Sequence, residues 1–236
     1  MGSISLHFED MDKSAYLLRF GEKEHLEQIR DGAIRFSKLS TYRCIESGVI
    51  GDGHEGVESI MHGRDIEELA FEHPSVGTIK FNHTNPTFTM TDIPNDDPYV
   101  FCMTYFTARD IQNKTIFDER VYAEEKWDSV LFITDPTGFV ENIKRSLSKY
   151  SPRFHAVRYL DYSKSQDSLD AFTKSDAYKW QREARFVVHL GDDLNENIER
   201  IDSSSIRVFY EPVQSVIIPT NEFIEGFYLD ANGGIA

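Results

Sequence analysis

The sequence predicts a single α+β domain in which short helices surround an antiparallel or mixed β-sheet. Two observations lead to this fold class: most structured segments have the short apolar or alternating patterns of strands, and few have the period of a helix. A third makes it one domain, residues 1–236, because no stretch rich in Pro, Gly or Ser divides the chain. The hydrophobic fraction of 40%, with 17 Phe and 11 Tyr, is enough for a packed core, which excludes a wholly disordered chain.

The N-terminal part predicts a strand, a short helix and a second strand. The two strand segments are residues 15–20 and 33–36. Between them, residues 22–31 place Leu26 and Ile29 at helical spacing, and Gly32 is a typical residue just beyond the end of a helix. We therefore expect the helix to end before the second strand begins.

The middle of the chain is less regular. Residues 37–63 are rich in Gly, Ser, His and acidic residues, which predicts a long loop. Residues 78–81 and 87–90 alternate in polarity and predict the two strands of a hairpin. For residues 57–98 as a whole, three roles stay open: a lid, a recognition insert, or plain scaffold.

The second half of the chain predicts further strands and one clear helix. The strand segments are residues 99–106, 130–134, 155–159, 186–190 and 213–218. Asp135 followed by Pro136 is a typical helix start, because Asp caps the first backbone N–H groups and proline fits the first helical position. The helix that follows is expected to bury one apolar face: Phe139, Val140, Ile143 and Leu147.

The net charge limits the classes of partner. The chain has 25 Lys and Arg against 40 Asp and Glu, a formal charge of −15. This charge excludes a protein that coats nucleic acid, since such binding depends on Lys and Arg at the phosphates. A local basic cleft is still compatible with it, because four arginines crowd the N-terminal part: Arg19, Arg30, Arg35 and Arg43.

No metal, disulfide or membrane segment is expected from the sequence. Cys44 and Cys102 lie far apart without Cys-x-x-Cys spacing, which favours a reducing cytoplasm as the location. No signal peptide is evident, and no apolar run approaches the roughly 18–20 residues of a membrane helix. Asp52, His54 and Glu55 carry metal-binding groups, but a complete ligand set is not evident, so we expect no metal.

The segment that precedes the strand at residues 186–190 carries the strongest chemical signal. It contains Gln181-x-Glu183-x-Arg185, and alternation along a strand would place these three side chains on one face. A glutamate at a strand entrance in a cleft can stabilise positive charge that develops in a reaction. The alternative is an exposed Glu–Arg pair of little energetic value, and spacing alone favours that alternative.

The order of several short motifs resembles the DUF2971 family, a bacterial group distantly similar to ADP-ribosyltransferases. The matching pieces span most of the chain and lie at residues 16–20, 32–37, 42–56, 101–104 and 174–185. Three positions depart from the pattern: Thr104 stands for Ser, Tyr178 for Trp, and Gln181 for Glu. The third departure bears on which acceptor is modified and leaves the glycosidic chemistry intact.

The resemblance implies a split-sheet, ADP-ribosyltransferase-like fold and an NAD-dependent mono-ADP-ribosyltransferase that releases nicotinamide. It implies two catalytic residues, Glu183 and Gln181. It also implies five NAD-binding residues: Arg19, Thr104, Tyr105, Ser37 and Tyr42. Physically, Arg19 on a rigid strand suits the diphosphate of NAD, and a carboxylate near the ribose suits the oxocarbenium-like cation of the reaction.

Bacterial transferases of this kind often act as toxins or phage-defence effectors, so the resemblance also implies a macromolecular acceptor and an antitoxin or chaperone as partner. The arginine cluster favours RNA or DNA over protein as the acceptor. Two other functions stay open: an NAD glycohydrolase with water as acceptor, and a non-catalytic binding or sensor module on the same fold.

Overall fold

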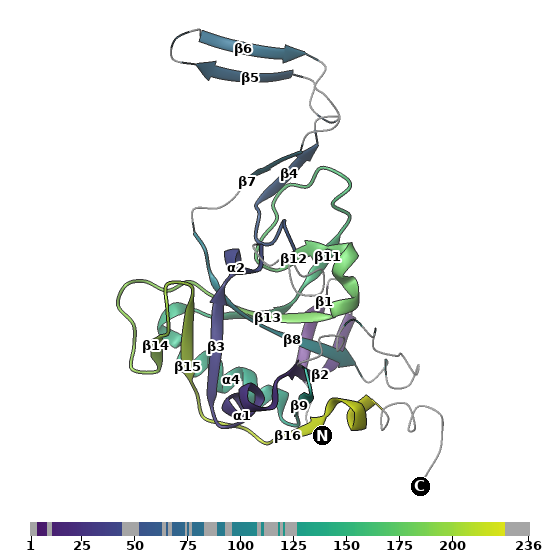
Figure 1. Ribbon diagram of the computed structural model, residues 1–236, viewed down its shortest axis with the longest axis vertical. Coiled ribbons are helices and arrows are strands. Elements are labelled where there is room, and N and C mark those ends of the chain that lie inside the picture. Colours follow the sequence, from purple (N-terminus) through teal and green to yellow (C-terminus); the bar gives the residue numbers. More distant parts are fainter. Residues whose placement is uncertain are drawn as a thin grey trace.

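The main sheet of the computed structural model has ten strands joined by antiparallel ladders (Figure 1). Seven strands form a row in the order β14 (Ile198–Arg200), β15 (Ser205–Phe209), β3 (Ala33–Lys38), β8 (Tyr99–Thr107), β2 (Met11–Gly21), β9 (Ser129–Ile133) and β16 (Ser215–Pro219). Three more attach to this row: β1 (Ile4–Phe8) pairs with β2, β13 (Glu183–Val188) with β8, and β10 (Arg153–Ala156) with β13. With few short helices, this sheet confirms the predicted α+β class.

The structure describes most of the chain. The described residues are 4–8, 11–43, 52–62, 65, 68–73, 75, 77–82, 89–92, 96–107, 110, 118, 120 and 127–224. Cys44 therefore lies outside them. Among the described helices, none is long and apolar enough to cross a membrane.

The sheet splits beside β8, because two of the three strands that pair with β8 share one of its edges. β13 pairs along residues 99–104 on one edge. On the other edge, β3 reaches only Tyr99 and Val100, whereas β2 pairs from Thr104 onwards. Within the described ladders, residues 101–103 therefore face neither β2 nor β3 on this edge. The two strands diverge there and leave a gap in the sheet.

The largest core cluster combines the main sheet with the helices α1 (Lys23–Arg30) and α4 (Pro136–Ser146). α1 buries Leu26 and Ile29 as predicted. The predicted start of α4 is also confirmed, since the Asp135 side chain accepts a hydrogen bond from the Gly138 N–H at 3.0 Å. The predicted apolar face of α4 is buried: Phe139, Val140, Ile143 and Leu147. A single 3₁₀ turn, η3 (Ser148–Tyr150), follows α4.

Three smaller apolar clusters lie apart from this core. The first contains Leu18 and Phe20 of β2 with residues of β8 and β9, the second contains Val187 of β13 with Leu39, and the third contains Val57 and Ile60. Leu39 begins the short helix α2 (Leu39–Arg43). The second cluster also contains Phe172, which directly precedes β12 (Thr173–Ser175) and whose carbonyl accepts from the N–H of Arg158 in β11 (Arg158–Leu160). The 3₁₀ helix η4 (Asp176–Gln181) follows β12.

Two strand pairs project from the sheet (Figure 1). They are β4 (Ser59–His62) with β7 (Thr89–Asp92), and β5 (Glu68–His73) with β6 (Gly77–Asn82). The predicted hairpin between residues 78–81 and 87–90 is therefore wrong, although residues 78–81 lie in β6 and residues 89 and 90 in β7, while residues 87 and 88 lie outside the description. Each pairs with an earlier strand, and alternation within a segment carries no information about its partner.

The predicted long loop at residues 37–63 and two predicted strands also need correction. β3 runs to Lys38, α2 follows directly, and β4 occupies the end of this range, while residues 44–51 lie outside the description. The strand predicted at residues 155–159 is divided, because the Val157 N–H donates to the carbonyl of Glu183 and the Arg158 N–H to that of Phe172. The strand predicted at residues 186–190 begins earlier, at Glu183, and ends at Val188.

Candidate functional site

A cavity of about 110 Å³ lies at the split beside β8. A cavity of roughly this size accommodates a single aromatic ring. Of the seven residues predicted for the site, five line it: Arg19, Tyr42, Thr104, Gln181 and Glu183. Four different elements thus bring predicted residues together, namely β2, α2, β8 and the η4–β13 junction.

Two predicted residues, Ser37 and Tyr105, are not part of the cavity lining. Tyr105 follows Thr104 on β8, and adjacent residues of a strand point to opposite faces, so Tyr105 packs against the largest core cluster instead. Ser37 lies where β3 is still paired, with Val100 on one side and Ser205 on the other. It therefore stands in an intact part of the sheet and not in the split.

Arg19 reaches across the split. Its Nη1 donates to the backbone oxygen of Cys102 at 2.8 Å, and its guanidinium lies 5.6 Å from the centre of the Phe101 ring. The Cys102 carbonyl can accept this bond because β8 has no ladder partner at this point of that edge. Within the described part of the chain, Arg19 forms no ion pair with a carboxylate. It therefore presents positive charge that no carboxylate of the described residues neutralises.

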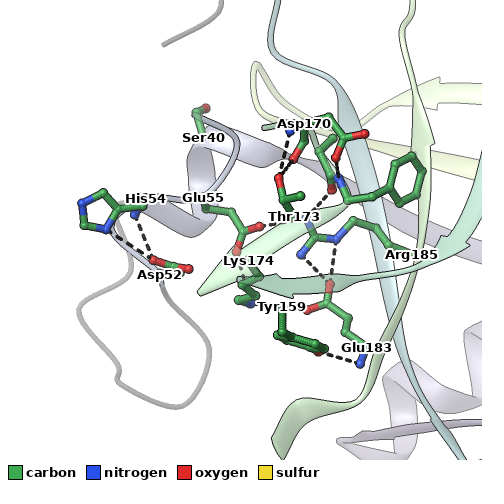
Figure 2. A network of polar contacts seen from close by, with 12 residues as sticks. Ser40, Asp52, His54, Glu55, Tyr159, Asp170, Thr173, Lys174, Glu183 and Arg185 are labelled. Atoms are coloured by element: carbon green, nitrogen blue, oxygen red, sulfur yellow. Dashed lines mark hydrogen bonds and ion pairs between the residues drawn. The ribbon is translucent and has the colours of Figure 1, made fainter. Parts of the chain in front are cut away.

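Four charged side chains of the cavity lining form a ring of alternating sign, and Figure 2 shows them together. Lys174 Nζ lies 3.1 Å from Glu55 Oε2 and 3.3 Å from Glu183 Oε2. Arg185 closes the ring, with Nη1 2.8 Å from Glu55 Oε1 and Nη2 2.6 Å from Glu183 Oε1. All four side chains are at most 8% exposed. Charges this deeply buried are retained only when they are paired in this way.

The ring keeps Glu183 ionised. Burial by itself would raise the pKa of this carboxyl group, but Arg185 and Lys174 outweigh burial and lower the pKa to about 2. Burial lowers the pKa of Lys174, yet the two carboxylates reverse the effect and raise it above its usual value. At neutral pH the cavity therefore contains a permanent carboxylate and not a general acid.

Two other groups of the cavity wall stay neutral. Burial raises the pKa of the Cys102 thiol to about 12, so this cysteine is not a thiolate at neutral pH. Burial also raises the pKa of the Tyr42 hydroxyl. Neither group is therefore an anionic nucleophile, which leaves Glu183 and Glu55 as the carboxylates of the described cavity lining.

Gln181 and Glu183 do not lie on one strand, contrary to the prediction. Gln181 ends η4, and Arg182 adopts the left-handed conformation with φ 48° and ψ 53° before β13 begins. Arg182 is held there by an ion pair with Asp110 and by a hydrogen bond from its Nε to the Tyr105 carbonyl, at 3.2 Å. Because the chain turns at Arg182, the residues on either side of it both face the cavity. The favoured alternative, an exposed Glu–Arg pair, is also wrong, since β13 is buried along its length.

Glu55 reaches the ring from a compact turn. The Asp52 carbonyl accepts from the Glu55 N–H at 2.9 Å, and Asp52 Oδ1 accepts from the His54 N–H at 2.9 Å. Gly56 follows with φ +69°, and a Cβ at this position would lie 2.4 Å from Leu39 Cδ2. The turn therefore depends on glycine to pack against α2 while Glu55 points inward.

Sequence reasoning did not assign Glu55, Lys174 or Arg185 to the site. All three stand in the short motifs that carry the resemblance, but a charged residue in a loop is usually solvated. The only other signal was the dense placement of acidic residues and glycines around Glu55. In the described residues, no group of three or more His, Cys, Asp or Glu is arranged to hold a metal ion.

The N-terminal arginines do not gather at the cavity. Only Arg19 lines it. Arg30 pairs with Asp31 at the end of α1, and Arg35 pairs with Asp202. The basic cleft that these arginines predicted is therefore reduced to a single residue.

Comparison of the chain with protein-family models, with curated proteins and with solved structures gives no match.

Proposed function

We propose that this protein is an NAD-dependent mono-ADP-ribosyltransferase. One observation carries the proposal: Arg19, Thr104 and Glu183, which come from three different strands, line one cavity at a split in the sheet. The resemblance implies the same three residues in the same chain order. The split and the three residues together support an ADP-ribosyltransferase-like fold.

Glu183 has the charge that the reaction requires. When the bond between C1′ of the ribose and the nicotinamide nitrogen breaks, its electron pair stays with the nitrogen, and positive charge develops on the ribose. An ionised carboxylate beside C1′ stabilises that charge. An acceptor atom then forms the new bond to C1′ with its lone pair and releases its proton to solvent water. Since the pKa of Glu183 is lowered to about 2, this residue supplies charge and not a proton.

The cavity as a whole suits an anionic ligand with a planar ring. Among the described lining residues, three cations (Arg19, Lys174 and Arg185) stand against two carboxylates, which gives one net positive charge. Arg19 carries that charge, and a guanidinium is well matched to phosphate oxygens. Tyr42 and Trp180 add aromatic surface to the same wall. A volume of about 110 Å³ holds the nicotinamide ring, so the rest of the dinucleotide would extend outside.

The biological role proposed from the resemblance is that of a toxin or phage-defence effector held in check by an antitoxin or chaperone in the cytoplasm. The acceptor proposed is a macromolecule. Because Arg30 and Arg35 pair elsewhere, the cavity itself gives no preference for nucleic acid. The experiment below is therefore designed to identify the acceptor.

The experiment incubates the protein with NAD labelled in its adenylate part and with cell extract, and measures nicotinamide release and the labelled fraction. Sensitivity of the label to RNase, DNase or protease identifies the acceptor, and free ADP-ribose alone indicates the glycohydrolase. Glu183→Gln should reduce nicotinamide release at least about 100-fold, as expected for loss of the main stabilising charge. Glu199→Gln, which alters an exposed ion pair with Arg207, is the matched control and should keep full activity. Unchanged release in Glu183→Gln, with the fold intact by circular dichroism, would refute the mechanism.

A further inference from the structure

The charged ring divides its contacts evenly between the two carboxylates. Each carboxylate gives one oxygen to Lys174 and the other to Arg185. Neither cation therefore belongs to Glu183 alone. The ring as a whole is electrically neutral, because it contains two positive and two negative groups.

Glu55 has no evident task other than to share these cations. Its Oε1 accepts from Arg185, and its buried Oε2 takes no hydrogen bond from any described residue and faces Lys174. Its side chain is 1% exposed, and it comes from the turn at residues 52–56, far in sequence from the strand that carries Glu183. Among the described residues its ion-pair partners are two cations, so this buried carboxylate acts through them.

We propose that Glu55 is a positioning residue that balances Lys174 and Arg185, so that Arg19 alone gives the cavity its positive charge. This inference rests on the proposed function for its effect on turnover, whereas its effect on binding requires only that the cavity takes an anion such as ADP-ribose. Without the Glu55 charge, both cations would turn to Glu183 and the cavity would carry two net positive charges. Such a cavity holds an anion more tightly but opposes the formation of a cation at C1′.

The loss of the Glu55 charge should raise the affinity for an anion and lower turnover. A variant that only disrupts the site would lower both, so the opposite directions distinguish the two cases. Glu55→Gln keeps the size of the side chain and removes one negative charge. We expect the affinity for ADP-ribose, used as the anionic probe, to rise about 10-fold or more and nicotinamide release to fall about 10- to 100-fold, as one unit charge at close range predicts. A variant that merely loosens the site would lose affinity and turnover together.

A charge-balanced double variant provides the matched control. Glu55→Gln with Lys174→Met removes one charge of each sign and returns the cavity to one net positive charge. Lys174→Met alone leaves no net charge. Affinity for ADP-ribose, measured by calorimetry, should therefore increase in the order Lys174→Met, then wild type and the double variant, then Glu55→Gln. If Glu55→Gln does not fold, the step from Lys174→Met to the double variant tests the same added charge.

The possible results separate this inference from the proposed function. Wild-type protein that binds ADP-ribose in the expected order of variants but releases no nicotinamide refutes the transferase and supports the role of Glu55. Weaker ADP-ribose binding by Glu55→Gln than by wild type, or a double variant no tighter than Lys174→Met, overturns the role of Glu55. Absence of ADP-ribose binding to every variant overturns it too.

Discussion

Arg182 should be more tolerant of glycine than of alanine, because its backbone is left-handed. Its φ of 48° and ψ of 53° place it in a region that only glycine adopts without cost. The residue also separates Gln181 from Glu183, so its conformation decides how both enter the cavity. Its side chain is tied to Asp110 and to the Tyr105 carbonyl.

The expected magnitudes follow from these two features. Both substitutions remove the contacts of the Arg182 guanidinium. Its side chain is 25% exposed and that of Asp110 is 17% exposed, so the loss should lower the free energy of unfolding by about 1–3 kcal/mol. In the alanine variant, the left-handed conformation lowers the free energy of unfolding by about a further 1–2 kcal/mol. Glycine also makes the unfolded chain more flexible, which reduces the stability difference between the two variants by about 0.4–1 kcal/mol. Taking the middle of each range, about 1.5 less about 0.7 kcal/mol, Arg182→Gly should be more stable than Arg182→Ala by about 0.8 kcal/mol.

Urea unfolding of the two variants and of wild type checks this order, and nicotinamide release reports the effect on the site. Asp110→Asn, which keeps the backbone of Arg182 and weakens its ion pair, is the control and should lose less stability than Arg182→Ala. An alanine variant as stable as the glycine variant would show that the left-handed turn is not maintained at this position. It would also remove the structural reason for Gln181 and Glu183 to face one cavity.

Two further predictions concern pH and the turn that carries Glu55. Because the folded pKa of Glu183 is about 2 and that of an unfolded glutamate is about 4.3, the stabilisation from this group is complete above about pH 5 and is lost as the pH falls toward 2. Nicotinamide release should accordingly show no inflection from Glu183 between about pH 5 and 8, and an inflection there that moves in Glu183→Asp would contradict a permanent carboxylate. Gly56→Ala should lower the free energy of unfolding by about 2–4 kcal/mol, since the added Cβ meets Leu39 at 2.4 Å and the φ is positive. Gly53→Ala, with open space around it, should stay within about 0.5 kcal/mol of wild type, and equal losses in the two variants would refute the packing argument.

Sequence patterns such as a helix cap or an apolar run predicted those elements that are determined by residues close together in the sequence. The helix after Asp135 begins where its cap predicts, and residues 99–106 form the central strand β8. The hairpin at residues 78–90 failed because strand pairing joins distant segments, and the same polarity pattern fits several partners. The strand boundary at Glu183 failed for a different reason, since Arg182 adopts a conformation that no side-chain pattern announces.

Sequence patterns were sufficient to predict the class of fold, the position of most strands, and a set of polar residues in the order that the resemblance implies. They could not show that five of those residues share a cavity, that Ser37 and Tyr105 do not, or that Glu55 and Lys174 complete a buried charged ring. The charge of a buried site depends on which side chains come together in the folded chain, away from water. That meeting is fixed by the split between β2 and β3 and by the turn at Arg182, both of which arise from contacts between segments far apart in the chain.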